Sequence, residues 1–568
     1  MKVELKLEGM TCLDCAHTLE QALGAVPGVE SAAVSYGAKR AAVTATDDVT
    51  VDRLLRTVEE AGYRAEVVGD SGPGTASPTS PEHGAPVGKA AARARKDDGD
   101  AAFDLVVIGS GSAGMSAAIR ASELGASVAV VESAEVVGGT CVNVGCIPSK
   151  HLVEAAHHYH LARTGYPGMT ASDPHLAWDE VLRQKRAVVE ELRKEKYIAV
   201  LDAYEGVTLL RGRAQLLGGG TIRVGEHDMA ARKVVIATGT RPAMPPIPGL
   251  RESGALDSTS VMELDRLPES MIVIGGGSIG LELGQAFLRF GVRVIVVEAL
   301  DRIVPNEDAD LSAALTEALE AEGMEFHTGA RVTAVERSEQ GYTVRIERGS
   351  LRGALEAEQL LVATGRRPNS EDLGLDAAGM RIDQRGFITV DEFMRTTNRD
   401  IHAAGDVTGG PGYVYVAALQ GGIAAQAALA EPGGNEAIPI ELTAVPRVTF
   451  TDPQVAAVGM TEAEAREAGL DPVVTSLPVR HLPRAAVSYR RHGVIKLVAE
   501  RGTDRLLGAH LVTANAGDVI GEAVLAVRFG LTTRDLVSSL HPYLTWGEGL
   551  KLAAQTFTKD IAKLSCCA

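Results

Sequence analysis

The sequence contains little cysteine, and what it has is unevenly placed. Six cysteines occur in 568 residues, and all fall into three close pairs, Cys12/Cys15, Cys141/Cys146 and Cys566/Cys567. So few cysteines cannot form the disulfide framework of a secreted domain. Close pairs in a long chain indicate metal binding or redox catalysis instead.

Positive charge and long apolar runs are also scarce. The 56 basic and 74 acidic residues leave a formal charge of −18, which argues against nonspecific binding to nucleic acid or to an anionic membrane. No run approaches the roughly 18 apolar residues of a membrane span, and the chain begins with alternating charged and apolar side chains. We therefore expect a soluble, cytoplasmic protein.

The chain is long enough for about three or four domains, and a break in composition separates the first of them. Residues 69–100 are rich in Gly, Pro, Ala, Ser and charge without an apolar period, which predicts a flexible linker. The preceding segment has the order strand, helix, strand, strand, helix, strand, with strands near residues 3–7, 29–35, 41–45 and 65–68. This order predicts a ferredoxin-like sandwich.

Two segments after the linker predict nucleotide-binding βαβ units. In the first, an apolar strand at residues 103–108 runs into a helix, and the glycines and the acid are Gly109, Gly111, Gly114 and Glu132. In the second, the corresponding residues are Gly275, Gly277, Gly280 and Glu298. Such glycines let the backbone approach a pyrophosphate at a helix N-terminus, and the acid can accept from a ribose hydroxyl. The chain is therefore expected to bind two nucleotides.

A cysteine pair follows the first unit. Cys141 and Cys146 lie in the segment GGTCVNVGCIPSK, separated by four residues at the start of a predicted helix. Two thiols at this spacing can close a small redox disulfide, and a helix N-terminus lowers the pKa of a thiol. A buried, inert pair is the alternative, but the neighbouring nucleotide unit favours a redox role.

The same segment resembles the signature of the flavin-dependent pyridine nucleotide-disulfide oxidoreductases. The motifs ATG at 237–239, ATG at 363–365 and AAGDV at 403–407 occur in the order of that family, so the resemblance covers residues from about 101 to 555. It implies FAD in the first nucleotide site and a reduced nicotinamide coenzyme in the second. It further implies that Asp406 holds the flavin side of FAD and that Lys150 pairs with Glu282 near the flavin ring. Further cofactor contacts are implied for Gly139, Thr140, Gly239 and Gly365.

With this resemblance the expected fold is α/β and α+β. It comprises two Rossmann-like FAD- and NAD(P)-binding domains and an α+β dimerisation domain, preceded by a ferredoxin-like βαββαβ metal-binding domain. The expected parts are a heavy-metal-associated domain (1–68), a linker (69–100), an FAD-binding domain in two segments (101–247 and 369–441), an NAD(P)H-binding domain (248–368), a dimerisation domain (442–555) and a tail (556–568).

The C-terminal segment bears on which substrate the chain takes. In the resembled family, members that act on disulfides carry a His-Pro pair followed by Glu, and the His serves as acid and base. Alignment on Glu548 and the helix after it puts Tyr543 at the His position, whereas alignment on His541 displaces the Glu by two residues. We prefer the first alignment, and a phenol suits a metal thiolate better than disulfide exchange. Tyr197 is a second candidate, although an ordinary aromatic on a helix face fits it equally.

The other two cysteine pairs predict ligands for a soft metal ion. Cys12 and Cys15 lie in the segment GMTCLDC, which resembles the metal-binding loop of heavy-metal-associated domains. Adjacent thiols such as Cys566 and Cys567 close a disulfide only with strain, but they can bind a soft ion. An accidental pair or a lipid-attachment site is the alternative, although the tail has no four-residue prenylation box.

Together these features resemble the mercuric reductases within the wider family. The resemblance implies that the N-terminal pair captures Hg(II) as a dithiolate and that the C-terminal pair passes it to the site of the other subunit of a homodimer. There Cys141 and Cys146 hold it for reduction to Hg(0), assisted by Tyr197 and Tyr543. Cys146 is expected to face the flavin, and Cys141 to be the more accessible exchange thiol.

The choice of coenzyme stays open at this point. Glu298 favours NADH, because a carboxylate at the end of this strand accepts from the ribose 2′-hydroxyl and repels a 2′-phosphate. The resembled family mostly uses NADPH, and Arg293 and Arg302 lie near enough in sequence to hold a phosphate. NADPH and NADH are both candidates.

Two other functions also remain open. The first is a lipoamide dehydrogenase-like disulfide oxidoreductase with a fused metal domain, which His541 and Glu298 favour. The second is a non-catalytic protein of soft-metal traffic, whose reductase portion only keeps the thiols reduced. The C-terminal cysteine pair argues against the first, and metal-dependent consumption of reduced coenzyme would exclude the second.

Overall fold

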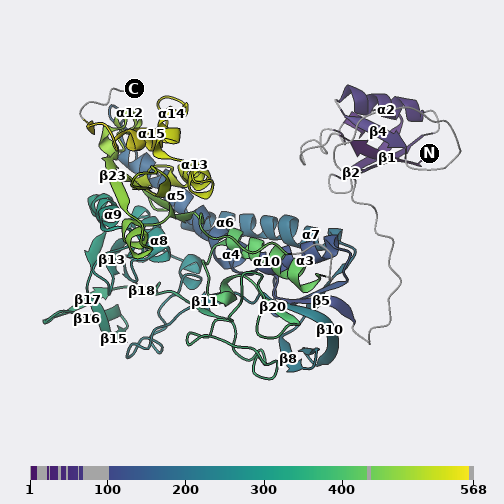
Figure 1. Cartoon of the computed structure of the whole chain (residues 1–568), viewed down its shortest axis with the longest axis horizontal. Coiled ribbons are helices and arrows are strands. Elements are labelled where there is room, and N and C mark those ends of the chain that lie inside the picture. Colours follow the sequence, from purple (N-terminus) through teal and green to yellow (C-terminus); the bar gives the residue numbers. More distant parts are fainter. Residues whose placement is uncertain are drawn as a thin grey trace. The chain divides into compact units, whose positions relative to one another are not determined.

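The computed structural model describes residues 2–8, 19, 22–24, 26–35, 40–46, 49–61, 63–67, 102–430 and 437–561. The chain divides into two compact units, Met1–Arg93 and Ala94–Ala568, and each is described by itself (Figure 1). The predicted linker and the cysteine pairs near the two ends of the chain lie outside the described residues.

The N-terminal unit is a four-stranded antiparallel sheet with the helix α2 (Val51–Glu60). The spatial order is β2-β3-β1-β4, with β1 (Lys2–Glu8), β2 (Val29–Ser35), β3 (Arg40–Ala45) and β4 (Arg64–Val67). Alternate residues of β3 are buried, because successive side chains of a strand point to opposite faces, and they pack against apolar residues of α2. The strand order confirms the predicted ferredoxin-like fold. Most of the first predicted helix lies outside the described residues.

The larger unit begins with a mostly parallel sheet. Its parallel strands have the order β7-β6-β5-β10-β20, and β10 continues into the antiparallel strands β9 and β8. The bounds are β5 (Phe103–Ile108), β6 (Val128–Glu132), β7 (Val207–Arg211), β8 (Ala214–Gly218), β9 (Thr221–Val224), β10 (His227–Ile236) and β20 (Ile401–Ala403). Strand β5 is buried on both faces, as a parallel strand between two layers requires, and one face packs on α3 (Ser112–Glu123) and α10 (Val414–Ala428).

Helices fill the connection from β6 to β7. They are α4 (Gly139–Val144), α5 (Cys146–Thr164), α6 (Trp178–Arg193), the π-helical turn η1 (Lys194–Ile198) and α7 (Ala199–Ala203). The short strands β11 (Thr240–Pro242) and β19 (Arg366–Pro368) pair with each other and join this domain to the next. Two 3-10 turns are also present. The turn η2 (Ser260–Glu263) follows β11, and the turn η3 (Asp406–Thr408) follows β20.

A second parallel sheet has the order β14-β13-β12-β18. Its strands are β12 (Ser270–Ile274), β13 (Arg293–Val297), β14 (Glu325–His327) and β18 (Gln359–Val362). One face packs on α8 (Ser278–Arg289) and α9 (Ala309–Ala321), and the other on the antiparallel sheet β15 (Arg331–Ser338), β16 (Gly341–Arg348) and β17 (Leu351–Ala357). The two predicted βαβ units are thus both present.

The third domain of this unit is an antiparallel sheet covered by helices. Its order is β21-β22-β25-β24-β23, with β21 (Arg447–Thr449), β22 (Gln454–Gly459), β23 (Pro472–Pro478), β24 (Val494–Glu500) and β25 (Leu506–Thr513). The helices are α11 (Glu462–Glu467), η4 (Val479–His481), α12 (Pro483–Ser488), α13 (Ala516–Arg528), α14 (Thr533–Ser538) and α15 (Glu548–Gln555). Figure 1 shows this domain at the end of the unit where α8 and α9 lie, and the architecture agrees with the predicted fold class.

Candidate active site and nucleotide-binding sites

The turn after β5 requires glycine at defined places. A Cβ on Gly109 would lie 2.4 Å from the carbonyl oxygen of Ala237, and one on Gly114 would lie 1.9 Å from that of Gly109. Gly109 also has φ +107°, which residues with a side chain rarely adopt. Gly111 is the N-cap of α3, whose first turn has no acidic residue. This N-terminus is therefore suited to an anion such as a pyrophosphate.

Glu132 binds the same turn from the end of β6. Its Oε2 accepts hydrogen bonds from the backbone N–H and the hydroxyl of Ser110, at 3.0 and 2.5 Å. Its Oε1 accepts from the N–H of Ala134 at 2.8 Å. The Ser110 hydroxyl also accepts from the N–H of Gly138, which ties the glycine turn to the start of the cysteine segment.

The predicted cofactor contacts Gly139 and Thr140 lie in the first turn of α4. A Cβ on Gly139 would lie 2.7 Å from the Cα of Gly111, so α4 packs directly on the glycine turn. Cys141 follows in the same helical turn. The local need for glycine thus places one thiol beside the first nucleotide site.

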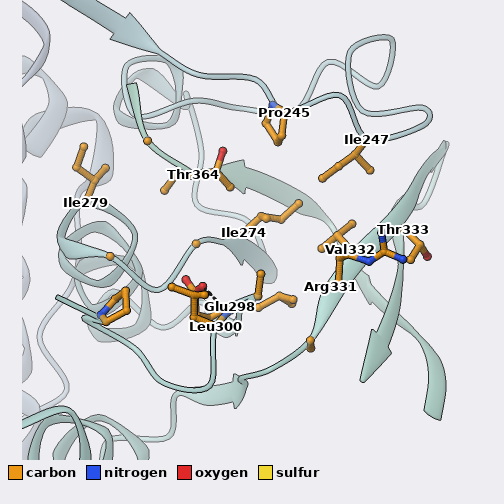
Figure 2. A pocket seen from close by; sticks show the side chains of 18 of the residues that line it. Pro245, Ile247, Ile274, Ile279, Glu298, Leu300, Arg331, Val332, Thr333 and Thr364 are labelled. Carbon is orange, nitrogen blue, oxygen red and sulfur yellow. Dashed lines mark hydrogen bonds between the residues drawn. The ribbon is translucent and has the colours of Figure 1, made fainter. Parts of the chain in front are cut away.

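The second glycine turn has the same construction and borders a cavity. A Cβ on Gly275 would lie 2.5 Å from the carbonyl oxygen of Ala363, and one on Gly280 would lie 2.2 Å from that of Gly275. Gly277 is the N-cap of α8, and no acidic residue lies in the first turn. The cavity has a volume of about 910 Å³, and its lining includes Gly275, Gly277, Glu298 and Gly365 (Figure 2).

The two arginines expected to hold a coenzyme phosphate differ in their place. Arg293 begins β13, about 16 Å of extended strand from Glu298, and donates to the carbonyl of Glu356 at 3.1 Å. Arg302 is not part of the cavity wall, but it donates to the carbonyl of Pro305, which is, at 3.3 Å. For Arg293, nearness in sequence was therefore a wrong guide, because a strand separates its two ends in space.

Cys141 and Cys146 are brought together as two free thiols. The Cys141 thiol donates a hydrogen bond to Cys146, which lowers the pKa of Cys146 to about 7. The nearby charge of Lys150 and the backbone N–H of Cys146 act in the same direction, while burial opposes them. The same hydrogen bond, with burial, raises the pKa of Cys141. The lowered pKa was predicted, but its largest cause is the partner thiol rather than the helix N-terminus.

The two thiols differ in exposure. Cys146 begins α5 and is exposed, whereas Cys141 lies inside α4 and is only partly exposed. The assignment of Cys146 to the flavin side and of Cys141 to thiol exchange stays a prediction.

Lys150 lies one helical turn after Cys146 and forms an ion pair with Glu282. The Lys150 Nζ donates to the Glu282 Oε2 at 2.5 Å and lies 4.6 Å from the ring centre of Phe450. Glu282 is buried, and its Oε1 accepts from the backbone N–H of Phe450 at 2.8 Å. The structure therefore contains the Lys150–Glu282 pair that the family resemblance implied.

Tyr197 lies in the π-helical turn beside the thiols. Burial and the charge of Cys141 raise its pKa, and its hydroxyl hydrogen-bonds with Ser112 of the glycine turn. A Cβ on Gly138 would lie 3.4 Å from its ring. Tyr197 also packs against the apolar core around α3, so its role at the site stays a prediction.

Two residues that the sequence analysis did not single out hold Asp406, Thr240 directly and Arg366 through Thr240. Thr240 donates its hydroxyl to Asp406 Oδ2 at 3.0 Å, and Arg366 donates to the hydroxyl and carbonyl of Thr240 at 2.7 and 2.8 Å. Burial lowers the pKa of Arg366, and the charge of Asp406 opposes this effect. Thr240 and Arg366 directly follow Gly239 and Gly365, so the two ATG motifs were the signal that could have identified them.

A second missed group attaches α8 to the segment 449–452. Side chains at helical spacing along α8 bond to successive residues of that segment, at 2.6 to 2.9 Å. The pairs are Ser278 with Thr449, Glu282 with Phe450, Gln285 with Asp452 and Arg289 with Asp452. These bonds fix the position of Glu282 relative to the third domain.

The two alignments of the C-terminal segment both stay predictions. Glu548 begins α15 and accepts from the backbone N–H of Leu544 at 3.3 Å. The His541 ring bonds to Glu522 at 2.7 Å and to the carbonyl of Ser539 at 3.1 Å. Tyr543 is exposed.

The predicted metal ligands Cys12, Cys15, Cys566 and Cys567 lie outside the described residues. Among the residues that the structure describes, no cluster of three or more His, Cys, Asp or Glu side chains is arranged to hold a metal ion. In the same part of the chain, no helix combines the length and apolar character needed to cross a membrane.

Three family descriptions match the chain. They are the pyridine nucleotide-disulphide oxidoreductases (residues 103–421), the dimerisation domain of the same proteins (445–554) and the heavy-metal-associated domain (4–64).

Characterised proteins match over most or all of the chain. A mercuric reductase of Staphylococcus aureus is 41% identical over 566 residues, which cover 100% of this chain and 99% of that protein. A mercuric reductase of Streptomyces lividans is 42% identical over 473 residues, 82% of this chain and 98% of that protein.

A solved structure also matches. The Cu(II) complex of the HOCl-induced flavoprotein disulfide reductase RclA from Escherichia coli is 31% identical, with a TM-score of 0.71, and the match covers 80% of this chain and 99% of that one. The glycine turns, the dithiol and these matches agree, and the chain belongs to the pyridine nucleotide-disulphide oxidoreductase family.

Proposed function

We propose that the chain is an FAD-dependent enzyme that reduces Hg(II) to Hg(0) with electrons from NAD(P)H, in mercury detoxification in the cytoplasm. The relatives named mercuric reductases match it from end to end, and a heavy-metal-associated segment precedes the reductase. The observation that carries the proposal is the Cys141–Cys146 dithiol, whose second thiol has a lowered pKa and lies near the Lys150–Glu282 pair.

The residues around the first glycine turn fit FAD. The N-terminus of α3 offers backbone N–H groups and has no acidic residue that would repel a pyrophosphate, and Glu132 ends the next strand as a ribose acceptor. A bound flavin supplies the two-electron carrier between coenzyme and substrate. The residues proposed to hold it are Gly109, Gly111, Gly114, Glu132, Gly139, Thr140, Lys150, Gly239 and Asp406.

The dithiol is proposed to bind Hg(II), the substrate, by thiol exchange. Each exchange forms one mercury–sulfur bond to the protein and breaks one to the incoming carrier, so no free ion is released. Cys146, with its pKa near 7, supplies a thiolate at neutral pH, and Cys141 gives up its proton to the departing carrier thiolate. In sum, Hg(SR)₂, NAD(P)H and H⁺ yield Hg(0), NAD(P)⁺ and two RSH.

The remaining cysteine pairs are proposed to deliver the ion. Cys12 and Cys15 capture Hg(II) on the N-terminal domain, and Cys566 and Cys567 of a second copy of the chain pass it to the dithiol. The match to a dimerisation domain supports a homodimer. Tyr197, and Tyr543 from the second copy, are proposed to assist at the metal.

The domain boundaries expected from the sequence are retained as part of the proposal. The division between the two compact units falls between residues 93 and 94, inside the predicted linker. The N-terminal domain is proposed to carry its ion to the tail by means of this linker.

A lipoamide dehydrogenase-like activity is the second candidate, and Glu298 favours it. The test is coenzyme oxidation by the purified yellow protein. We expect NAD(P)H to be consumed only when Hg(II) and excess thiol are both present. Turnover of lipoamide without mercury would favour the second candidate, and no mercury-dependent turnover would contradict the proposed function.

A further inference from the structure

The cavity beside the second glycine turn has a fixed carboxylate in its wall. Figure 2 shows Glu298 beside Leu300 in the wall of the cavity, with Ile279 on one side and Arg331 on the other. We propose that the chain takes NADH in preference to NADPH and that Glu298 makes this choice. The inference rests on the proposed use of a reduced nicotinamide coenzyme, but not on mercury as the substrate.

Glu298 is held in place by backbone donors at both oxygens. The N–H of Gly276 donates to Oε2 at 2.7 Å, and the N–H of Leu300 donates to Oε1 at 2.8 Å. A carboxylate has about four acceptor positions, so about two remain for a ligand. They suit the hydroxyls of an adenosine ribose, whereas a 2′-phosphate would bring negative charge against a carboxylate that cannot turn away.

The first nucleotide turn differs at the matching position. There Ser110 gives Glu132 a hydroxyl donor as well as an N–H, so three acceptor positions are used within the protein. In the second turn this place is taken by Gly276, where a Cβ would lie 3.2 Å from the Cβ and 3.3 Å from the Oε2 of Glu298. Because Gly276 has no hydroxyl, Glu298 keeps one more acceptor position than Glu132 for a coenzyme that binds and leaves in each catalytic cycle.

The cations near the cavity do not compensate for the Glu298 charge. Arg293 lies at the far end of β13. Arg302 is not part of the cavity wall, and its guanidinium is engaged by Asp301 and by the carbonyl of the cavity residue Pro305, each at 3.3 Å. Arg331 is the one arginine or lysine among the residues lining the cavity, and it forms an ion pair with Glu347 at 3.3 Å. A 2′-phosphate would therefore meet one opposed carboxylate and one guanidinium that is already paired.

The test uses two fragments that cannot transfer electrons, ADP-ribose and 2′-phospho-ADP-ribose, with calorimetry on the FAD-loaded full chain. We expect ADP-ribose to bind at least about 30-fold more tightly, and kcat/KM with any electron acceptor to favour NADH to a similar degree. Glu298→Gln should reduce the preference to about 5-fold or less, mainly by tighter binding of the phosphorylated fragment. Glu298→Ala tests the same loss of charge if the Gln variant folds poorly.

Glu320→Gln is the matched control. Glu320 is exposed on α9 and is not part of the cavity wall, so its substitution changes the net charge equally without altering the preference. Equal binding of the two fragments by the unaltered chain would overturn the inference, as would a preference for ADP-ribose that survives both Glu298 variants. A failure of mercury-dependent turnover alone would leave this result unaffected, because the binding assay contains no mercury.

Discussion

Lys150 and Glu282 form an ion pair that joins the redox helix to the second nucleotide domain, with 2.5 Å between Lys150 Nζ and Glu282 Oε2. Lys150 lies four residues after Cys146, so the two share a face of α5. The charge of Lys150 lowers the pKa of Cys146 and the charge of Glu282 raises it. The two charges therefore act in opposite directions on the fraction of Cys146 that is present as thiolate.

Lys150→Met should raise the pKa of Cys146 above its value of about 7, because the neighbouring cation is lost while Glu282 remains. The pH dependence of alkylation by iodoacetamide, followed on the reduced enzyme, measures this value. Lys150→Arg keeps the charge and should leave the profile in place. An unchanged profile in the Met variant would mean that Lys150 has no electrostatic effect on the thiol.

Asp452 should be among the more sensitive positions for stability. Its carboxylate is bonded to Arg289 at 2.9 Å and lies 3.3 Å from His157, and Arg490 is a further partner. Asp452→Ala removes one of the two carboxylates that bind the buried Arg289, while Glu322 stays paired with it, and should cost about 1.5–3 kcal/mol, seen as a lower thermal midpoint. Glu180→Ala, which breaks an exposed pair with Arg183, is the control and should not shift the midpoint. Equal midpoints for both variants would contradict this account.

His402 should make the fold sensitive to acid. The side chain is 2% exposed, and neither ring nitrogen has a hydrogen-bond partner among the described residues. Burial, with the charges of Lys233 and Arg395, lowers the pKa of His402 to about 4, so the unfolded chain binds a proton at higher pH than the folded one does. Stability is therefore lost as pH falls from about 6.5 towards 4, by about 2 kcal/mol between pH 7 and pH 5.

His402→Leu should remove this part of the pH dependence, because the substituted side chain cannot bind a proton. Thermal unfolding at pH 7 and pH 5 measures it in both proteins. The variant should lose less stability than the parent between the two pH values. An identical loss would show that His402 does not control acid sensitivity.

The proposed relay predicts a substrate-dependent defect. Cys566→Ala/Cys567→Ala should slow turnover at least about 10-fold when mercury is supplied as a tight dithiol complex, since exchange then lacks its intermediate ligands. Steady-state turnover of the parent and of the double variant is compared with mercury supplied as a weak and as a tight thiol complex. Full turnover of the double variant with the tight complex would end the relay hypothesis.

The sequence predicted those features that depend on local geometry. The glycine turns at Gly109 and Gly275 were recognisable because a side chain there would collide with backbone, and the strands beside them are continuous apolar runs. The Lys150–Glu282 pair joins residues 132 positions apart, and it was accessible only through the family resemblance. The same is true of the alignment that favours Tyr543.

Contacts that depend on three-dimensional packing were not predictable. The attachment of α8 to Asp452 joins two domains, and no local pattern marks it. Arg293 was assigned to the coenzyme site because it is near Glu298 in sequence, yet an extended strand keeps the two apart.

The central claim is that Cys141 and Cys146 together deliver electrons to mercury. The most direct measurement is the release of mercury vapour per NADH or NADPH consumed, compared between the parent protein and Cys141→Ser and Cys146→Ser variants loaded with FAD. The account predicts one Hg(0) per coenzyme in the parent and a loss of vapour release of at least about 100-fold in each variant. Vapour release at the parent rate by either variant would contradict it.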